Sequence, residues 1–550
     1  MAKDDETELE LIKRKPLNEN QGNHEETTSE QESDPGVESY SESESESESD
    51  INDNQSRLIN TSNQNPIKPR TYLILSTISI IFILFIFSIA PHFSIESISK
   101  TTLKQIKPIG PPGSITSNTE HWASQGGTWN NVDLDEKFKE SDKLASLSNS
   151  THHFKKTLIV VSLDGFRLDY LDRNLTSNLI SLTEKGGLRA KGLKPQFPSL
   201  TFPNHWSMLT GLYPESHGIV SNNFYDPNLD LNFTNTNPSI SWDSYWWGGE
   251  PIWSTASKNQ MKTAVMMWPG PPYTSEKIRP TYWRAFQEHF KWSKRIQLLE
   301  SWLDMPIHER PELIFIYLPD LDEVGHRNGA ESSQLNQTLI QMNHFVNRLD
   351  QSLSNRNLSE IVDVVYVSDH GMSSSDDHRL IYLDQILGSK HFSNLIGIDG
   401  WPAAGLRFKE GYDLESVLKQ LDKSSQHSES FKVYTHETMP DRWHFSNNQR
   451  IAPIYIVPSL GWVVTTTQEH KVEMKGHFRT KGIHGYDNDL EEMQGIFFAY
   501  GPSFRKKSIK SNLIDRFSNL EIYSLIIKLL NITDHLPKQN STLNFWDQYL

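Results

Sequence analysis

The chain carries acidic and histidine side chains in four separate motifs that one hydrolytic metal centre could share. The motifs are V-S-L-D-G-F, D-E-V-G-H, V-S-D-H-G-M and G-I-H-G-Y-D-N, and their candidate metal ligands are Asp164, Asp322, His326, Asp369, His370 and His484. A fifth motif, F-P-S-L-T-F-P-N-H, places the hydroxyl of Thr201 on a proline-flanked turn. Carboxylate and imidazole ligands suit zinc, and a bound metal ion can activate a hydroxyl as a nucleophile. These residue types predict two three-ligand metal sites beside a threonine nucleophile.

Three of the motifs follow short apolar runs, which we predict to be buried parallel strands. The runs are Leu158 to Ser162, Leu313 to Leu318 and Ile361 to Ser368. An acidic residue stands at or just beyond the carboxyl end of each run. Open α/β sheets bind ligands outside the carboxyl ends of their strands, so we expect Asp164, Asp322 and Asp369 to meet there. The helical spacing of residues 332–353 predicts one of the crossover helices.

Composition excludes several other classes of protein. Lys+Arg 53 against Asp+Glu 69 gives a net charge of -16, and the acid is concentrated in residues 1–70. The rest of the chain has no basic stripe, so we expect no nucleic-acid polymer as a partner. Cysteine is absent, which removes thiolate metal sites, cysteine nucleophiles and disulfides. No protein partner can be inferred. We expect the 15 tryptophans to pack the core, a carbohydrate-binding platform being the alternative.

The N-terminal part predicts a tail and a membrane anchor. Residues 1–70 lack an apolar core and should form a disordered acidic cytoplasmic tail. Its acid-embedded serines are candidate phosphorylation sites, and a solvated tail without a specific role is the alternative. Residues 71–91 include an uncharged run from Tyr72 to Ala90, which as a helix would span about 28 Å and could cross a bilayer core of ~30 Å. A buried apolar helix is the alternative to this signal anchor.

We therefore expect a single-pass type II membrane protein. Lys68 and Arg70 favour a cytoplasmic N-terminus, and the catalytic part would be extracellular or in a vacuolar or other endomembrane lumen. Residues 92–155 would form a stalk and residues 156–550 the catalytic domain. Glycosylation sequons after the anchor fit this orientation, although Asn54 and Asn60 before it also match. The later sequons begin at Asn149, Asn174, Asn232, Asn336, Asn357, Asn531 and Asn540.

The chain resembles the nucleotide pyrophosphatase/phosphodiesterase family of the alkaline phosphatase superfamily. The resemblance runs from about Lys156 to Thr542 and rests on V-S-L-D-G-F-R, T-F-P-N-H-W-S-M-L-T-G-L-Y-P-E-S-H-G-I, G-E-P-I-W, S-D-H-G-M and G-I-H-G-Y-D-N. It implies an α/β, alkaline-phosphatase-like fold, with a mostly parallel central sheet and helices on both faces. The stretch F-S-N-L-E-I-Y-S-L-I-I-K-L-L-N-I resembles the closing helix of the family.

The resemblance also implies a role for each site residue. One zinc would be held by Asp322, His326 and His484. The second zinc would be held by Asp164, Asp369 and His370, with Thr201 bound to it. Asn222 matches a residue that helps to hold a phosphate oxygen. The positions that resemble the nucleoside-stacking aromatics are Phe202, Tyr282 and Tyr317. His205, in the nucleophile turn, is expected to serve the structure of that turn.

Two stretches depart from the pattern of the family. The lead into the first zinc motif is Y-L-P-D-L-D, which makes Asp320 a competitor to Asp322. We prefer Asp322 because it keeps the four-residue spacing to His326. Pro271 and Pro272 follow W-P-G, where the family often continues with a small polar and then an acidic residue, so the resemblance does not extend to the rim of the pocket.

The expected activity is zinc-dependent hydrolysis of nucleotide phosphodiester or pyrophosphate bonds through a phosphothreonine intermediate, releasing a nucleoside 5'-monophosphate. The substrates would be nucleoside triphosphates or nucleotide sugars. The main alternative is a lipid phosphodiesterase on the same fold, because its metal centre would look the same. A sulfatase would need a cysteine or serine in a C/S-x-P-x-R setting, which Thr201 and its neighbours do not provide. A catalytically silent relative would not be expected to keep seven site residues.

Overall fold

The computed structural model describes residues 146–426, 428–505 and 512–550. The predicted tail, the predicted anchor and most of the predicted stalk lie outside these residues. Across the described ranges, no helix combines the length and apolar character needed to cross a membrane.

An eight-stranded sheet forms the centre of the catalytic part, in the order β21-β4-β20-β11-β3-β10-β8-β9. The three strands predicted from apolar runs lie side by side at its middle and are parallel, as expected. The bounds are β3 Thr157–Leu163, β10 Leu313–Leu318, β11 Val362–Val367, β4 Leu188–Ala190, β8 Thr263–Met266, β9 Tyr282–Arg284, β20 Phe497–Tyr500 and β21 Leu513–Ile514. Every residue of the three middle strands is buried, which is why they read as continuous apolar runs.

The sheet is mixed, because β20 runs antiparallel to both of its neighbours, β11 and β4. The other five pairings are parallel. The expectation of a mostly parallel sheet therefore holds with one reversed strand.

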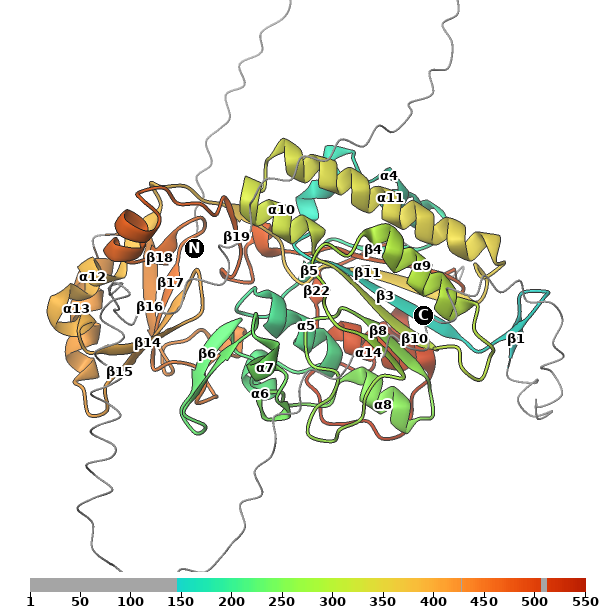
Figure 1. The fold of residues 1–550 in the computed structure, drawn as a ribbon, viewed down its shortest axis with the longest axis horizontal. Helices are drawn as coiled ribbons and strands as arrows, with labels where there is room; N and C mark the ends of the chain where they lie inside the picture. Colours follow the sequence, from blue (N-terminus) through green and yellow to red (C-terminus); the bar gives the residue numbers. More distant parts are fainter. Residues whose placement is uncertain (1–145, 427, 506–511) are drawn as a thin grey trace, which may run out of the picture. The chain divides into compact units, whose positions relative to one another are not determined.

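Helices cover both faces of this sheet, as expected (Figure 1). One group comprises α4 (Ser177–Glu184), α9 (Trp292–Leu303), α10 (Asp320–Asn328) and α11 (Ser333–Asn355). The other group comprises α5 (Thr201–Thr210), α8 (Ile252–Lys258) and α14 (Glu521–Leu530). The predicted crossover and closing helices are thus observed as α11 and α14.

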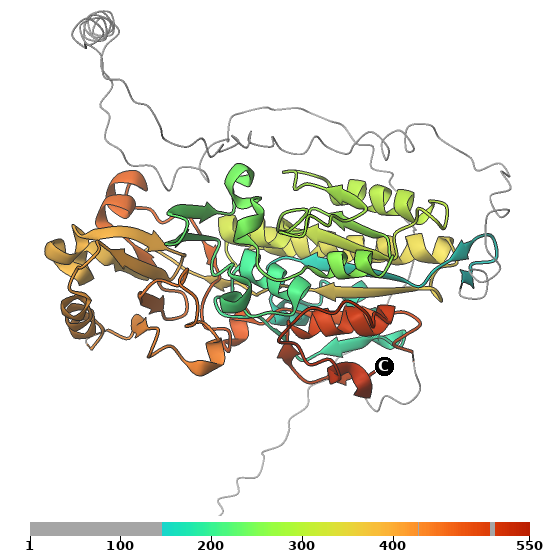
Figure 2. The ribbon, with the colours of Figure 1, turned by 90° about the horizontal axis from the view of Figure 1, so that it is seen from below.

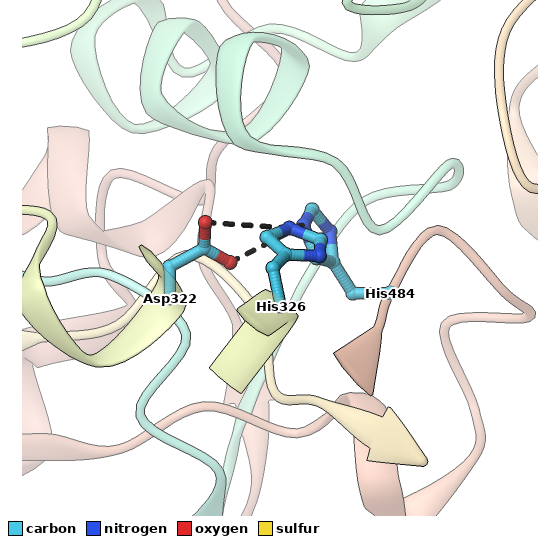
Figure 3. Close-up of side chains that lie close together, drawn as sticks. All are labelled: Asp322, His326 and His484. Carbon is cyan, nitrogen blue, oxygen red and sulfur yellow. Dashed lines mark hydrogen bonds and ion pairs between the residues drawn. The ribbon is translucent and has the colours of Figure 1, made fainter. Parts of the chain in front are cut away.

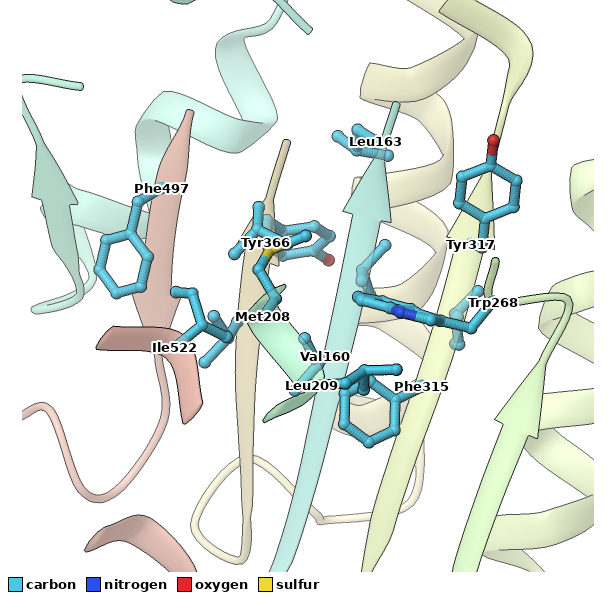
Figure 4. Packing of buried hydrophobic residues seen from close by; sticks show 14 of the residues in the cluster. Val160, Leu163, Met208, Leu209, Trp268, Phe315, Tyr317, Tyr366, Phe497 and Ile522 are labelled. Carbon is cyan, nitrogen blue, oxygen red and sulfur yellow. The ribbon is translucent and has the colours of Figure 1, made fainter. Parts of the chain in front are cut away.

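Large side chains from strands and helices interlock beneath the carboxyl edge of the sheet (Figure 4). Val160 of β3 and Phe315 of β10 pack beside Leu209 of α5, while Ile522 of α14 lies nearer to β20. Fully burying one such side chain contributes about 1.5–3 kcal/mol. A chain without cysteine can hold its active-site edge in place through this packing.

Residues 380–465 form a smaller lobe that the sequence did not reveal. Its antiparallel sheet has the order β14-β15-β17-β16, and α12 (Leu383–Phe392) and α13 (Leu414–Ser425) pack together beside it. The strands are β14 Leu395–Asp399, β15 Ala404–Phe408, β16 Phe431–Thr435 and β17 Ile454–Pro458. A separate apolar cluster, including Leu387, Leu406 and Val417, fills its interior. Figures 1 and 2 both show this orange lobe to one side of the main sheet.

The folded part begins before Lys156, within the predicted stalk. Strands β1 (Leu147–Ser148) and β2 (His153–Phe154) form an antiparallel pair. The Arg310 guanidinium lies 3.7 Å from the centre of the Phe154 ring and donates to the carbonyl of His153 at 2.7 Å. Residues 146–154 are therefore tied to the catalytic part.

Candidate active site

The carboxyl ends of the three middle strands bring the predicted aspartates together. Asp164 directly follows β3, and Asp369 follows β11 by two residues. Asp322 and His326 lie four residues apart on α10, the helix that follows β10, so they face the same side. Gly165 has a φ of 68°, and a Cβ there would lie 3.0 Å from the Cα of Asp322. A larger residue at Gly165 would therefore push two ligand-bearing segments apart.

A short strand pair brings His484 to the same place from beyond the smaller lobe. β12 (Ser373–Ser374) lies just after His370, and β19 (Gly482–Ile483) ends immediately before His484. These strands pair antiparallel, with Ser373 opposite Ile483. The rings of His370 and His484 consequently stack, with centroids 3.6 Å apart and an interplanar angle of 14°.

The first predicted ligand triplet is closely grouped (Figure 3). His326 Nε2 lies 3.4 Å from Asp322 Oδ2, and His484 Nε2 lies 3.3 Å from Asp322 Oδ1. The two Nε2 atoms are 3.0 Å apart. The three side chains therefore offer ligand atoms to a common point.

The second predicted triplet surrounds the threonine hydroxyl. His370 Nε2 lies 3.0 Å from Asp369 Oδ2 and 3.5 Å from Asp164 Oδ1. Thr201 Oγ1 lies 3.2 Å from the same His370 nitrogen. Two further triplets of nearby ligand atoms overlap these groups: Asp164 with Asp322 and His370, and Asp164 with His205 and Asp369.

Backbone carbonyls fix the orientation of all three imidazoles. The Nδ1 atoms of His326, His370 and His484 lie 2.7–2.9 Å from backbone carbonyl oxygens, to which they donate. The Nε2 atom of each neutral ring then carries a lone pair that points into the site. Outer partners of this kind orient metal-ligating histidines in proteins.

The site has a surplus of negative charge that a cation would neutralise. Burial, together with the charges of Asp369 and Asp322, raises the pKa of Asp164 well above its usual value. Burial and the neighbouring His370 lower the pKa of His484 to about 4, so this ring is neutral at pH 7. Among the described residues, Asp164 Oδ1, Asp322 Oδ1 and Asp369 Oδ2 are buried without a hydrogen-bond partner. Buried charges are normally paired or bound to metals, so this donor set fits metal ions.

The nucleophile candidate stands at the first turn of a helix. Thr201 begins α5, whose unpaired N–H groups and dipole favour an anion at this end. The backbone N–H of Phe202 donates to Asn222 Oδ1 at 3.0 Å. That bond orients the side-chain amide of Asn222 beside the first turn of α5.

His205 connects the nucleophile turn to the metal ligands. Its Nε2 lies 2.8 Å from Ser162 Oγ, and its Nδ1 lies 2.9 Å from the carbonyl oxygen of Thr201. The same Nδ1 is 3.3 Å from Asp369 Oδ2. Both ring nitrogens are thus engaged by the protein, which agrees with the structural role expected for His205. The four-residue spacing from Thr201 was the available sequence signal for this contact.

The ring of Tyr317 is enclosed rather than presented to a substrate. It is 7% exposed and packs edge-on against His205. Its hydroxyl donates to Asp164 Oδ2 at 2.5 Å. This geometry gives Tyr317 a contact with a predicted metal ligand that its expected stacking role did not include.

The structure does not bring Tyr282 to the carboxyl edge. Strand pairing sets Tyr282 level with Ala264, which lies level with Ile314 on β10. Ile314 precedes Tyr317 by three residues, so Tyr282 lies about 10 Å short of that edge. Its ring instead stacks on Trp302, with centroids 6.4 Å apart.

Phe286 is an aromatic residue that the sequence reading missed. It lies beyond the end of β9 and is 49% exposed. Its ring centroid is 6.4 Å from that of Tyr317, whereas the ring of Tyr282 stacks on Trp302. The signal that could have found Phe286 was its place just after the carboxyl end of a strand.

Asp320 and Asp322, the two candidates for the same metal-ligand position, face different sides of α10. Asp320 faces Arg295, with its Oδ2 3.9 Å from the guanidinium Nη1. Asp322, not Asp320, faces His326 and His484. The fold and this site together define an α/β protein with a partly to fully buried cluster of carboxylates and imidazoles at the carboxyl edge of its sheet.

Comparisons with known proteins agree with this class. A family model described as type I phosphodiesterase / nucleotide pyrophosphatase matches residues 158–487. An uncharacterized pyrophosphatase/phosphodiesterase of Schizosaccharomyces pombe is 40% identical over 392 residues, covering 70% of this chain and 79% of that protein. Venom phosphodiesterase 2 of Crotalus adamanteus is 34% identical over 385 residues, covering 68% of this chain and 45% of the venom protein. The chain thus spans less than half the length of this venom relative.

Among solved structures, murine ectonucleotide pyrophosphatase/phosphodiesterase 5 is similar, with a TM-score of 0.63 and 31% identity. The match covers 72% of this chain and 99% of the murine chain. The chain belongs to the nucleotide pyrophosphatase/phosphodiesterase family of the alkaline phosphatase superfamily. The predicted family, the alkaline-phosphatase-like α/β fold and the assignment as a hydrolase of this type are confirmed.

Proposed function

We propose that the protein is a zinc-dependent nucleotide pyrophosphatase/phosphodiesterase that releases a nucleoside 5'-monophosphate. The observation that carries this proposal is the convergence of six carboxylate and imidazole side chains beside the hydroxyl of Thr201. One zinc would be held by Asp322, His326 and His484, and the other by Asp164, Asp369 and His370. The names of the relatives support such a substrate, because venom phosphodiesterase 2 is named for phosphodiester cleavage. An inactive variant of murine ectonucleotide pyrophosphatase/phosphodiesterase 5 was solved in complex with AMP.

The reaction would proceed through a covalent intermediate on the chain. Two bound zinc ions would supply positive charge that activates the hydroxyl and stabilises the attacking and leaving oxygens. Thr201 Oγ1 would form a bond to phosphorus, and the bond from phosphorus to the leaving alcohol or phosphate oxygen would break. The NH₂ group of Asn222 and the N-terminus of α5 would hold a non-bridging oxygen. Water would then cleave the phosphothreonine and release the nucleoside monophosphate.

A lipid phosphodiesterase is the alternative with the same centre. The cleft beside α10 has a charged lining that includes Lys291, Arg295 and Glu323, which suits a polar nucleotide better than an acyl chain. The test is a side-by-side assay of the purified protein on ATP, a nucleotide sugar and a lysophospholipid. We expect hydrolysis of the two nucleotides, and faster turnover of the lipid would replace our proposal with the alternative.

Truncating Phe286 should affect nucleotides selectively. An exposed ring offers a face on which any base can stack, and removing such a contact costs about 1–3 kcal/mol. Phe286→Ala should therefore reduce kcat/KM for ATP at least ~5-fold more than for a small aryl phosphodiester. Phe202→Ala, beside the candidate nucleophile Thr201, should likewise reduce kcat/KM for ATP more than for the aryl phosphodiester. Equal losses on both substrates would mean that these rings are structural.

Removing the hydroxyl of Tyr317 should weaken metal binding. Tyr317→Phe leaves Asp164 Oδ2 without its donor, and loss of such an outer partner typically lowers metal affinity about 10–100-fold. Competition with a graded chelator, read as zinc retained per chain, measures the effect. Tyr366→Phe removes a hydroxyl from another buried tyrosine, on β11, and should retain zinc like the wild type. Unchanged zinc retention in Tyr317→Phe would show that the hydroxyl does not support the metal site.

We also propose the type II topology with the catalytic part outside the cytosol. The amide nitrogen of Asn149 donates to the carbonyl of Arg356 at 2.8 Å, so a glycan at this buried atom would disrupt the fold. Mass spectrometry of the native protein should find Asn149 unmodified. Glycans are expected at the exposed sequons Asn174, Asn232, Asn357, Asn531 and Asn540. Modification at Asn54 or Asn60 would instead reverse the proposed orientation.

A further inference from the structure

A polar cleft of about 400 Å³ lies against the side of α10 that does not face the metal ligands. Its lining includes Gln287, Phe290, Arg295, Pro319, Asp320 and Glu323. Asp320 and Glu323 are three residues apart on α10 and share one face of the helix. Asp322 and His326 occupy the neighbouring face, so the cleft and the metal-type centre share one helix.

Two chain segments lead from the active site into this cleft. One runs from Phe286, the exposed ring at the mouth, directly to Gln287. The other runs from Tyr317, whose hydroxyl bonds Asp164, through Leu318 to Pro319. A nucleotide with its phosphate beside Thr201 and its base against Phe286 would therefore present the far edge of the base to the cleft.

The cleft contains buried polar atoms that lack partners. Arg295 is only 2% exposed, and its Nε makes no hydrogen bond to any residue that the structure describes. Its Nη1 donates to the carbonyl of Phe290 and lies 3.9 Å from Asp320 Oδ2. Asp320 Oδ2 is also buried without a hydrogen-bond partner in the described ranges. Leaving such atoms unpaired is costly, so they favour a polar ligand or water.

The carboxylates decide which polar ligand fits. Ionised carboxylates only accept hydrogen bonds, and they repel a carbonyl oxygen placed in the same position. Glu323 uses Oε2 to hold Arg327 at 3.1 Å, which leaves Oε1 to accept from a ligand. An amino group on the edge of a base would satisfy these acceptors, whereas an oxo group could pair only with the Arg295 Nε donor and would be repelled by the two carboxylates.

We propose that Asp320 and Glu323 bind the exocyclic amine of a base stacked on Phe286, so that adenine and cytosine nucleotides are preferred over hypoxanthine and uracil nucleotides. This inference rests on the proposed nucleotide pyrophosphatase activity and adds a base preference to it. Stacking alone would tolerate every base, and the cleft supplies the discrimination.

The test compares ATP with ITP, and CTP with UTP, by kcat/KM. The wild type should prefer the amino base in each pair by about tenfold, the size expected of one hydrogen bond to a charged group. Asp320→Asn and Glu323→Gln should each bring the ratios towards one. Glu415→Gln is the matched control, because Glu415 also forms an i,i+4 ion pair, on α13, with Lys419. It should keep the wild-type ratios.

Hydrolysis of a small aryl phosphodiester by the same preparations distinguishes failure of the base preference from failure of the proposed nucleotide activity. If the wild type cleaves nucleotides without preferring the amino base, the base-reading role is overturned and the nucleotide activity stands. If the preference survives in both cleft variants, these carboxylates are not its source. If the aryl diester is cleaved and no nucleotide is, the proposed function fails, and the base preference fails with it.

Discussion

Replacing Thr201 with alanine should abolish nucleotide hydrolysis while leaving the fold intact. The hydroxyl touches the ligand cluster at 3.2 Å from His370 Nε2, at the first turn of α5. Losing the covalent route should reduce kcat at least ~1,000-fold. Steady-state release of nucleoside monophosphate from ATP measures this loss, and zinc content and thermal unfolding check that the variant is folded and loaded.

Serine provides the matched control for this position. Thr201→Ser keeps the hydroxyl at the start of α5 and removes only a methyl group, so measurable turnover should remain. An alanine variant that approached wild-type turnover would rule out nucleophilic catalysis by Thr201.

Removing the metal ions should eliminate activity and lower stability together. Without cations, Asp164, Asp322 and Asp369 lie close together, each with a buried oxygen that has no hydrogen-bond partner. Chelation should abolish turnover, zinc should restore it, and metal analysis of the restored protein should give about two zinc ions per chain. Saturating zinc at ~1,000 times its dissociation constant should add about 4 kcal/mol to the free energy of unfolding.

Two neighbouring acids provide a sharp control for the metal assignment. Asp322→Asn should lose one zinc per chain, because Asp322 alone of the pair faces His326 and His484. Asp320→Asn should retain both ions, because Asp320 faces Arg295 instead. One zinc in the wild type, or activity that survives exhaustive chelation, would contradict the two-site arrangement.

The arrangement of the candidate metal ligands was predictable because it follows from local rules. Apolar runs predicted β3, β10 and β11, and aspartates at the carboxyl ends of parallel strands must share one edge of the sheet. The four-residue spacing of Asp322 and His326 predicted a common helix face. His484 was found through its motif, since nothing in the intervening residues indicated that β12 and β19 would pair across the smaller lobe.

The aromatic residues were harder to predict because their roles depend on register. Tyr282 and Phe286 lie four residues apart, and only the pairing of β9 with β8 shows which ring reaches the mouth of the site. An aromatic ring at Tyr317 suggested base stacking. In the structure its hydroxyl instead donates to Asp164, which follows the neighbouring strand β3. The antiparallel direction of β20 was also hidden, because a buried apolar run does not encode strand direction.

Acid-quench labelling of the enzyme during turnover tests the central claim most directly. The protein is mixed with ATP labelled at either the α- or the γ-phosphate, quenched in acid and digested, and the labelled peptide is sequenced by mass spectrometry. The account predicts that α-label, carried as a nucleoside monophosphate, appears on Thr201 while unlabelled pyrophosphate is released. Transfer of γ-label with release of orthophosphate, or no adduct on Thr201 during steady turnover, would contradict it.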